Sequence, residues 1–339
     1  MARQVQTNER RSFPVTKTTD KMLLRLHLAN PRGFCAGVER AVLIVEQALA
    51  QYGAPVYVRH EIVHNRRVVE RLEKLGAIFV DEIDEIPDGA PMNVPVIFSA
   101  HGVPKSVPQA ASARGLNWLD ATCPLVSKVH IEVARHVAEG RHILLIGHAA
   151  HPEIIGTMGQ VPAAHVSLIE NADDAHNVAP PPVPLAYASQ TTLSVDDTAE
   201  IIAILTQRFA DIAAPHKDDI CYATTNRQQA VKELATKVSV MLVIGASNSS
   251  NAQRLVEVAT RAGCAAAYLI KDVTDINWEK LIGVQDVGLT AGASAPEEIV
   301  QEVISAFEQH FNLHLINQTG LEEAVHFKLP RALRQASQN

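Results

Sequence analysis

The chain has 339 residues, of which 47% are apolar and 20% charged, and this length suits three domains of roughly 100 residues better than one core. A net charge of −7 and only 4% aromatic residues argue against a nucleic-acid partner, because they supply neither a basic field nor stacking surfaces. No apolar stretch reaches the roughly 18–20 residues of a membrane span, so we expect no membrane association.

Residues 1–21 lack the apolar centre of a secretory signal and predict a disordered N-terminal extension. Glu9 and Asp20 interrupt its basic run, which argues against an organellar address. The four cysteines include no close pair, a pattern typical of reduced thiols rather than disulfides. We therefore expect a cytoplasmic enzyme.

Cys35, Cys123 and Cys221 mark three repeated units, because they lie 88 and 98 residues apart and each ends an apolar run. An amphipathic pattern with apolar residues at three- and four-residue steps follows each cysteine and predicts a helix. Each sulfur should therefore lie at a helix N-terminus, where backbone N–H groups and the helix dipole favour the metal-ligating thiolate. The predicted helices cover 36–49, 124–137 and 222–235.

Two further polar turns repeat in each unit, each between an expected strand and an expected helix. His64, His151 and Ser249 occupy the first of these turns, 87 and 98 residues apart. His101, Thr191 and Gly292 occupy the second, 90 and 101 residues apart. All three sets of intervals lengthen by about the same amount between the second and third units, as one insertion would produce.

The repeat predicts an α/β fold of three pseudo-threefold-related units with mainly parallel sheets. Ligands of such folds bind at the carboxyl edge of the sheet, so nine turns would converge on one cavity suited to a metal centre and an anion. The expected divisions are an extension at 1–21, units at 22–119, 120–216 and 217–312, and a C-terminal tail at 313–339.

The three separated thiols do not match zinc fingers or ribbons, whose ligands come in close pairs. Soft thiolates select zinc, copper(I) or iron–sulfur clusters, and a cubane cluster with three protein ligands leaves one iron open for a substrate. The structural alternative is that the cysteines are buried strand-end residues, since free Cys is often buried. Cys264 serves as an internal control, because no polar turn follows it and a core position is expected.

Several polar residues of the turns offer donors beside backbone N–H groups at helix starts, an arrangement that receives phosphate. A diphosphate is the simplest anion that needs so many donors. Taken singly, each residue could instead be a helix cap or turn residue. The candidates are His64, His101, Ser249, Ser250, Asn251 and Ser294.

Glu153 is the only carboxylate directly inside one of these turns. A carboxyl group in a closed, largely apolar cavity tends to have a raised pKa and can deliver protons, with Thr191 and His151 as relays. The alternative is a first-turn glutamate after Pro152 that stabilises a helix N-terminus. Metal ligands, an anion site and one proton donor together predict reductive removal of a hydroxyl group from a phosphorylated substrate.

The chain resembles the hydroxymethylbutenyl diphosphate reductase (LytB) family, the last enzymes of the methylerythritol phosphate route to isoprenoids. The resemblance runs from about Leu24 to the LPRALR segment, and the departures are the N-terminal extension, the PMNV stretch and Cys264. The segments that carry it are ANPRGFCAGVERA, EIVHNR, FSAHGV, DATCPLVSKVH, GHAAHPEIIGTMGQ, QTTLSVDDT, DDICYATTNRQ, NSSN and TAGASAP.

The resemblance implies a trefoil around a 4Fe-4S cluster that is bound by Cys35, Cys123 and Cys221. It also implies that Glu153 and Thr191 serve the substrate hydroxyl. The residues implied around the diphosphate are His64, His101, His151, Ser249, Ser250, Asn251 and Ser294.

The implied oxidoreductase takes two electrons and two protons, releases water, and yields isopentenyl and dimethylallyl diphosphate. Ferredoxin or flavodoxin is the expected electron donor, since the turns GFCAG and GASNSS do not fit the G-x-G-x-x-G nucleotide fingerprint. Two alternatives remain at this point. An aconitase-like hydro-lyase also uses three cysteines and an open iron, and an electron-transfer module would need the cluster alone.

Overall fold

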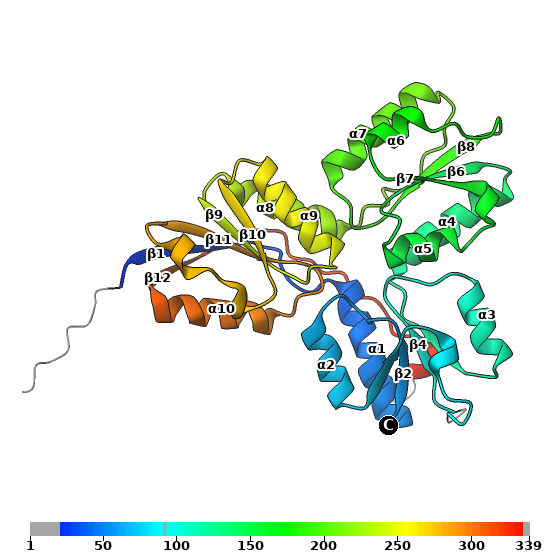
Figure 1. Ribbon diagram of the computed structural model, residues 1–339, viewed down its shortest axis with the longest axis horizontal. Coiled ribbons are helices and arrows are strands. Elements are labelled where there is room, and N and C mark those ends of the chain that lie inside the picture. The colour runs from blue at the N-terminus through cyan, green and yellow to red at the C-terminus, as the bar shows by residue number, and fades with distance from the viewer. Residues whose placement is uncertain (1–20, 91–92, 335–339) are drawn as a thin grey trace, which may run out of the picture.

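The structure is a computed structural model, and it describes residues 21–90 and 93–334. Apart from Lys21, the predicted N-terminal extension lies outside the described residues. The described chain forms three lobes that meet at the centre of the molecule (Figure 1). Every strand pair is parallel within the described residues, so the predicted α/β class with three parallel-sheet units is confirmed.

The first unit has a four-stranded sheet in the order β3-β2-β4-β5. Helices α1 and α2 cover one face of the sheet and α3 covers the other. Its strands are β2 (Val56–Arg59), β3 (Ala77–Val80), β4 (Val96–Phe98) and β5 (Trp118–Asp120). Its helices are α1 (Ala36–Tyr52), α2 (Arg66–Lys74), α3 (Ser106–Ala113) and a 3₁₀ turn at Ile83–Glu85.

The second unit repeats this plan with a three-stranded sheet in the order β7-β6-β8. Helices α4 and α5 pack on one face, and α6 and α7 pack on the other. Its strands are β6 (His142–Ile146), β7 (Val166–Ile169) and β8 (Leu185–Ser189). Its helices are α4 (Pro124–Ala138), α5 (Pro152–Met158), α6 (Ala172–Asn177), α7 (Val195–Arg208) and a 3₁₀ turn at Ala163–His165.

The third unit has a five-stranded sheet in the order β10-β9-β11-β1-β12. Helix α10 packs on one face, and α8 and α9 pack on the other. Its strands are β1 (Leu23–Leu28), β9 (Val240–Ile244), β10 (Ala266–Ile270), β11 (Asp286–Ala291) and β12 (Asn312–Asn317). Its helices are α8 (Tyr222–Ala235), α9 (Ser250–Arg261), α10 (Glu297–His310) and 3₁₀ turns at Val273–Asp275 and Trp278–Leu281.

Sheet membership departs from the expected divisions at both ends of the chain. Strand β1 belongs to the predicted first unit at 22–119, yet it lies in the third sheet, between β11 and β12. Strand β12 starts the predicted tail at 313–339 and completes the same sheet. The physical reason is that strand partners are chosen by long-range packing, which a contiguous division of the sequence does not capture. The divisions themselves remain a prediction.

The three units share one strand arrangement. Strands β2, β6 and β9 each lie inside their sheet, between the next two strands of their unit. All five residues of β6 and of β9 are buried, as expected for parallel strands covered on both faces. Strands β3 and β7, which the sequence analysis did not predict, follow the second helix in their units.

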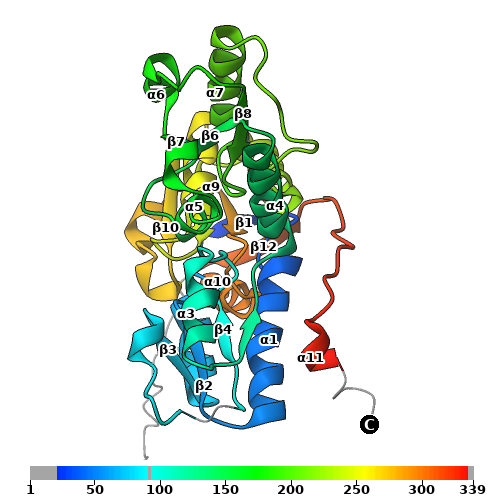
Figure 2. The same ribbon diagram turned by 90° about the vertical axis from the view of Figure 1, so that its right-hand side faces the viewer.

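The chain after β12 runs from the third lobe back to the first, where the short helix α11 (Arg331–Arg334) lies beside α1 (Figure 2). Leu333 of α11 is fully buried in the core that α1 helps to form. No helix among the described residues has both the length and the apolar character needed to cross a membrane.

Candidate active site

One cavity of about 100 Å³ lies where the carboxyl ends of the three sheets meet. All nine predicted turns contribute to its lining, as expected from the repeat. Every residue predicted for the site lies on this cavity, so the structure brings the whole set together. They are Cys35, His64, His101, Cys123, His151, Glu153, Thr191, Cys221, Ser249, Ser250, Asn251 and Ser294.

The three repeat cysteines are the N-cap residues of α1, α4 and α8, as the sequence predicted. Gly37 lies between two of them: a Cβ at this position would be 2.6 Å from the Cys123 sulfur and 3.8 Å from the Cys35 sulfur. The hydroxyl and backbone N–H of Thr224 lie 3.2 Å and 3.4 Å from the Cys221 sulfur. The absence of a side chain at Gly37 therefore leaves the space between the thiols open.

The expectation that the helix N-termini favour the thiolates does not hold for the protein without a metal. Burial raises the pKa of Cys123 to about 12 and that of Cys221 to about 11, and the neighbouring Cys35 adds to both increases. Backbone N–H groups lower these pKa values, but desolvation of the charged form is the larger effect. At Cys123 and Cys221 burial therefore outweighs the effect of the helix N-terminus.

Cys264 lies in the core, as predicted. Only 4% of it is exposed, and it packs with apolar residues of α8 and α9 against the third sheet. Its sulfur faces the backbone oxygens of Val238 and Ala266 at 3.7 Å and 3.2 Å. It does not line the cavity, so the contrast with the three repeat cysteines is maintained.

Three imidazoles gather at one part of the cavity. The rings of His64 and His101 stack with their centroids 4.2 Å apart, and His151 meets both rings edge-on at 5.9 Å. Burial and the neighbouring rings lower the pKa of His151 to about 3 and hold that of His101 well below its usual value. The negative charge of an anion among these rings would attract their protonated forms and so offset the cost of desolvating them.

His64 has polar partners from two units. Its Nδ1 lies 3.2 Å from a carboxylate oxygen of Glu61, and the amide of Asn248 donates to the same oxygen at 3.1 Å. The hydroxyl of Ser294 donates to the backbone oxygen of His64 at 3.1 Å. The other ring nitrogen, Nε2, is buried without a hydrogen-bond partner, so it is available to a ligand.

The Ser-Ser-Asn turn begins α9, and its side chains are nearly completely buried. Ser249 caps the helix by accepting from the backbone N–H of Ala252 at 3.4 Å, which is the role that the structural alternative predicted for it. The amide of Asn251 accepts from the Ala293 backbone N–H at 2.9 Å and donates to the Thr224 hydroxyl at 3.4 Å. The turn thus directs both a helix N-terminus and buried polar groups toward the cavity.

Glu153 lies in the first turn of α5, but only 2% of it is exposed. Its carboxyl group accepts from the backbone N–H of Thr191 at 2.7 Å and from the Thr191 hydroxyl at 3.0 Å. Desolvation raises the pKa of Glu153 to about 7, although the two hydrogen bonds from Thr191 oppose this increase. The predicted raised pKa and the predicted neighbourhood of Thr191 therefore agree with the structure.

The sequence analysis missed several residues of this site. Thr192 and Thr224 line the cavity, and each stands in a turn whose neighbouring residue was predicted. Buried Gln190 donates to the hydroxyls of Thr192 at 2.8 Å and of Ser250 at 3.2 Å, which links the second and third units. The positions of Thr192 beside Thr191 and of Asn248 beside Ser249 could have identified them, whereas Thr224 and Glu61 each lie three residues from a predicted residue.

Comparisons with known proteins agree with the site. The LytB protein family model matches residues 26–308. A 4-hydroxy-3-methylbut-2-enyl diphosphate reductase of Roseobacter denitrificans is 59% identical over 92% of this chain and 98% of its own length. The reductase of the same name from Hyphomonas neptunium is 60% identical over 93% of this chain and 99% of its own length.

Solved structures agree as well. The E-1-hydroxy-2-methyl-but-2-enyl-4-diphosphate reductase of Plasmodium falciparum superposes with a TM-score of 0.85 at 37% identity, covering 94% of this chain and 98% of that one. A structure of (E)-4-hydroxy-3-methyl-but-2-enyl diphosphate reductase, described as the terminal enzyme of the non-mevalonate pathway, gives a TM-score of 0.60 at 32% identity, covering 85% and 100%. On the family match and on the identity along nearly the whole chain, this protein belongs to the LytB family.

Proposed function

We propose that this protein reduces (E)-4-hydroxy-3-methylbut-2-enyl diphosphate to isopentenyl and dimethylallyl diphosphate. The observation that carries the proposal is the joint placement, in one cavity, of three thiols, an anion-receiving group of imidazoles and a buried carboxyl group. In this reaction the allylic C–O bond breaks, two electrons enter, one proton leaves with the hydroxyl as water, and the second proton adds to carbon.

We propose a 4Fe-4S cluster as the cofactor, held by Cys35, Cys123 and Cys221. The fit rests on the donor set and on Gly37, where a side chain would fill the space between two of the sulfurs. When bound, such a cluster would supply electrons and a Lewis-acidic iron without a protein ligand at the hydroxyl end of the substrate.

The diphosphate would lie among the imidazoles and the α9 N-terminus. The unpartnered Nε2 of His64, the hydroxyls of Ser249, Ser250 and Ser294, and the helix dipole all favour a polyanion there. His101, His151 and Asn251 complete the set that we assign to this ligand. The role of these residues is to bind and orient the substrate, so that its hydroxyl end reaches the thiols.

Glu153 is the proposed proton donor. With a pKa of about 7, its carboxyl group is partly protonated at neutral pH and can give a proton to the departing hydroxyl oxygen. The Thr191 hydroxyl touches the carboxyl group at 3.0 Å and is placed to pass the proton, with His151 as the alternative relay. Burial of Glu153 also keeps water away from the carboxyl group, which preserves the raised pKa.

The partner and location remain predictions from the sequence. We propose that ferredoxin or flavodoxin delivers the electrons, because the sequence shows no nucleotide fingerprint of its own. We also propose a cytoplasmic location, because the four cysteines include no close pair, a pattern typical of reduced thiols.

The function can be tested with protein that is purified without oxygen. We expect an iron–sulfur absorption band, and we expect dithionite plus the allylic diphosphate to yield both products. An aconitase-like hydro-lyase would turn over without reductant, and an electron-transfer module would be reduced without forming product. Either result would contradict the proposed reaction.

A further inference from the structure

Three basic side chains outside the cavity repeat with the same threefold rhythm as the cysteines. Arg40 and Lys128 each lie five residues after the cysteine that begins their helix, and Arg227 lies six residues after its cysteine. They stand in the first two turns of α1, α4 and α8. Each lies on a helix that begins at one cysteine, and in all three cases it donates to the backbone just before the next cysteine of the cycle.

Arg40 reaches from the helix that begins at Cys35 to the segment before Cys123. Its Nη1 donates to the backbone oxygens of Ala121 at 3.3 Å and Thr122 at 3.1 Å, and these two residues directly precede Cys123. Its Nε donates to the backbone oxygen of Lys328 in the C-terminal segment at 2.9 Å. Within the described part of the chain all three of these acceptors are backbone carbonyls, and no carboxylate forms an ion pair with Arg40.

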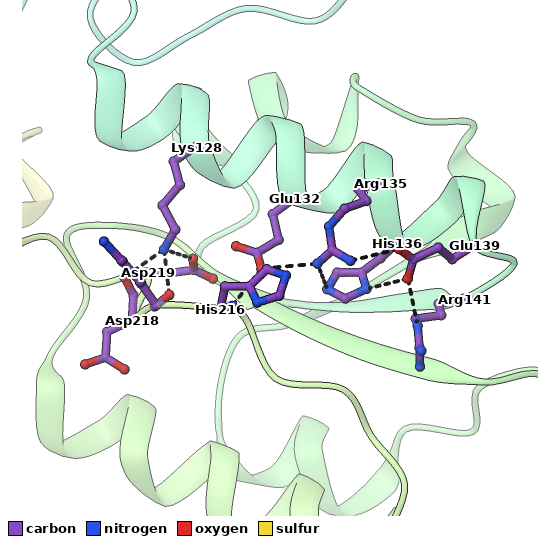
Figure 3. Close-up of polar contacts among 10 residues, drawn as sticks. Lys128, Glu132, Arg135, His136, Glu139, Arg141, His216, Asp218 and Asp219 are labelled. Carbon is purple, nitrogen blue, oxygen red and sulfur yellow. Dashed lines mark hydrogen bonds and ion pairs between the residues drawn. The ribbon is translucent and has the colours of Figure 1, made fainter.

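Lys128 reaches from the helix that begins at Cys123 to the segment before Cys221. Its Nζ donates to the backbone oxygens of Lys217 at 2.6 Å and Asp218 at 2.9 Å, and pairs with the Asp219 carboxylate at 3.1 Å (Figure 3). The other oxygen of buried Asp219 accepts from the Ser189 backbone N–H at 2.9 Å. These contacts attach the segment that leads into Cys221 to the helix that begins at Cys123.

Arg227 reaches from the helix that begins at Cys221 to the segment before Cys35. Its Nε and Nη2 donate to the backbone oxygen of Gly33 at 3.1 Å and 2.8 Å, and Nη2 also donates to that of Phe34 at 3.2 Å. Gly33 and Phe34 directly precede Cys35. Only 1% of Arg227 is exposed, and its charge is balanced by Glu323 at 3.1 Å.

The three links therefore run head to tail and close on themselves. The first helix holds the second cysteine segment, the second holds the third, and the third holds the first. A head-to-tail contact that is repeated about a rotation axis closes into a ring only when the rotation fits, and here the contacts do close. Removing any one link leaves carbonyl groups without a donor and lets one pair of cysteine segments separate.

We propose that Arg40, Lys128 and Arg227 are positioning residues whose ring of hydrogen bonds sets the spacing of the three cysteine segments for the iron–sulfur cluster. This inference rests on the proposed function, because it takes the three thiols to be the cluster ligands. It extends that function by assigning cofactor retention to residues outside the cavity.

A residue that merely stabilises the fold would behave differently, and Arg208 provides the matched control. Arg208 ends α7 and also donates to backbone oxygens, those of Ala175 and Val178, but both acceptors lie within its own unit and neither precedes a cysteine. Arg208→Gln should lower stability without changing the spacing of the thiols. Arg40→Gln should change both, and it leaves no buried carboxylate unpaired.

The experiment loads parent, Arg40→Gln and Arg208→Gln with cluster under anaerobic conditions. The rate of iron transfer to an excess of a ferrous chelator is then measured, together with the unfolding midpoint of each cluster-free chain. We expect Arg40→Gln to release iron about tenfold faster than the parent, the usual effect of losing a hydrogen bond to a charged group. Arg208→Gln should release iron at the parental rate even where its unfolding midpoint falls. Equal acceleration in both variants, or in neither, would overturn the proposal.

Two further variants test the ring itself. Lys128→Gln should release iron faster than the parent. Lys128→Arg should release it at the parental rate, because arginine can also donate to several carbonyl oxygens. In a closed ring, breaking a second link frees little motion that breaking the first has not already freed. The increase in iron-release rate of the double variant Arg40→Gln, Lys128→Gln should therefore be smaller than the product of the two single increases. Multiplicative effects would show independent contacts and refute the ring. A parent protein that binds no cluster would refute the proposed cofactor itself, which is a distinguishable result.

Discussion

Glu153 and Thr191 lie 38 residues apart in the sequence and form a hydrogen-bonded pair on the cavity wall. The backbone N–H of Thr191 donates to one oxygen of the Glu153 carboxyl group at 2.7 Å, and the Thr191 hydroxyl donates to the other at 3.0 Å. The pair fixes the carboxyl orientation, while burial raises its pKa to about 7. An acid that is held in this way is ready to serve one substrate atom.

We expect Glu153→Gln to separate binding from chemistry. The amide keeps the size of the carboxyl group and can still accept from the Thr191 backbone, but it cannot deliver a proton. Substrate should still perturb the cluster spectrum, while single-turnover product yield with a reduced cluster falls by roughly two orders of magnitude or more. Glu139→Gln, an exposed position in the same unit, should behave as the parent. Near-parental yield in the Glu153 variant would shift the proton source to His151 or to the diphosphate.

The rate of the same single turnover should depend on pH. The acid form of Glu153 is present below its raised pKa of about 7 and is lost as the pH rises through that value. With the cluster reduced in advance, the parental rate should therefore fall about tenfold per unit above pH 7. The residual rate of Glu153→Gln should lack this dependence, and a parental rate that is flat from pH 6 to 9 would contradict the assignment.

Anion binding should respond to His64→Ala and to Asn251→Ala. Each variant removes a buried polar group that we assign to the diphosphate, a loss of about 1.5–3 kcal/mol, or roughly ten- to hundredfold in affinity. The cluster spectrum should stay parental. Asn251→Ala also deprives the Ala293 backbone N–H of its acceptor, so its effect should be the larger of the two.

Titration calorimetry with substrate measures these affinities. The exposed residue His176 of α6 provides the matched control, because His176→Ala also removes an imidazole. The diphosphate must be held elsewhere if the two site variants bind substrate as the control does.

The cysteines should divide into two classes. Replacing Cys35, Cys123 or Cys221 with Ser should cripple cluster retention and turnover, because each sulfur lies on the shared cavity. Cys264→Ser should keep iron content near that of the parent, since its sulfur meets only the core and two backbone oxygens. Iron analysis after anaerobic reconstitution checks this, and equal iron loss in all four variants would refute the ligand assignment.

Much of the site could be predicted because its information is local. A cysteine between an apolar run and an amphipathic pattern predicts a helix N-terminus, and Cys35, Cys123 and Cys221 are indeed N-caps. The spacing of His64, His151 and Ser249, which follows that of the cysteines, then predicts equivalent turns, and parallel strands carry those turns to one edge. The same local logic fails for the thiol pKa values, because burial is not visible in a helix pattern.

The sequence by itself determined the threefold repeat, the α/β class and many of the polar residues that line the cavity, since each follows from short-range periodicity and from the chemistry of residue types. Only the tertiary structure decided that β1 and β12 complete the third sheet, and that Arg40, Lys128 and Arg227 each donate to the backbone before the next cysteine of the cycle. The physical reason is distance along the chain: these partners are separated by about 80 to 290 residues, and a hydrogen bond over such a separation is specified by packing geometry and leaves no local pattern.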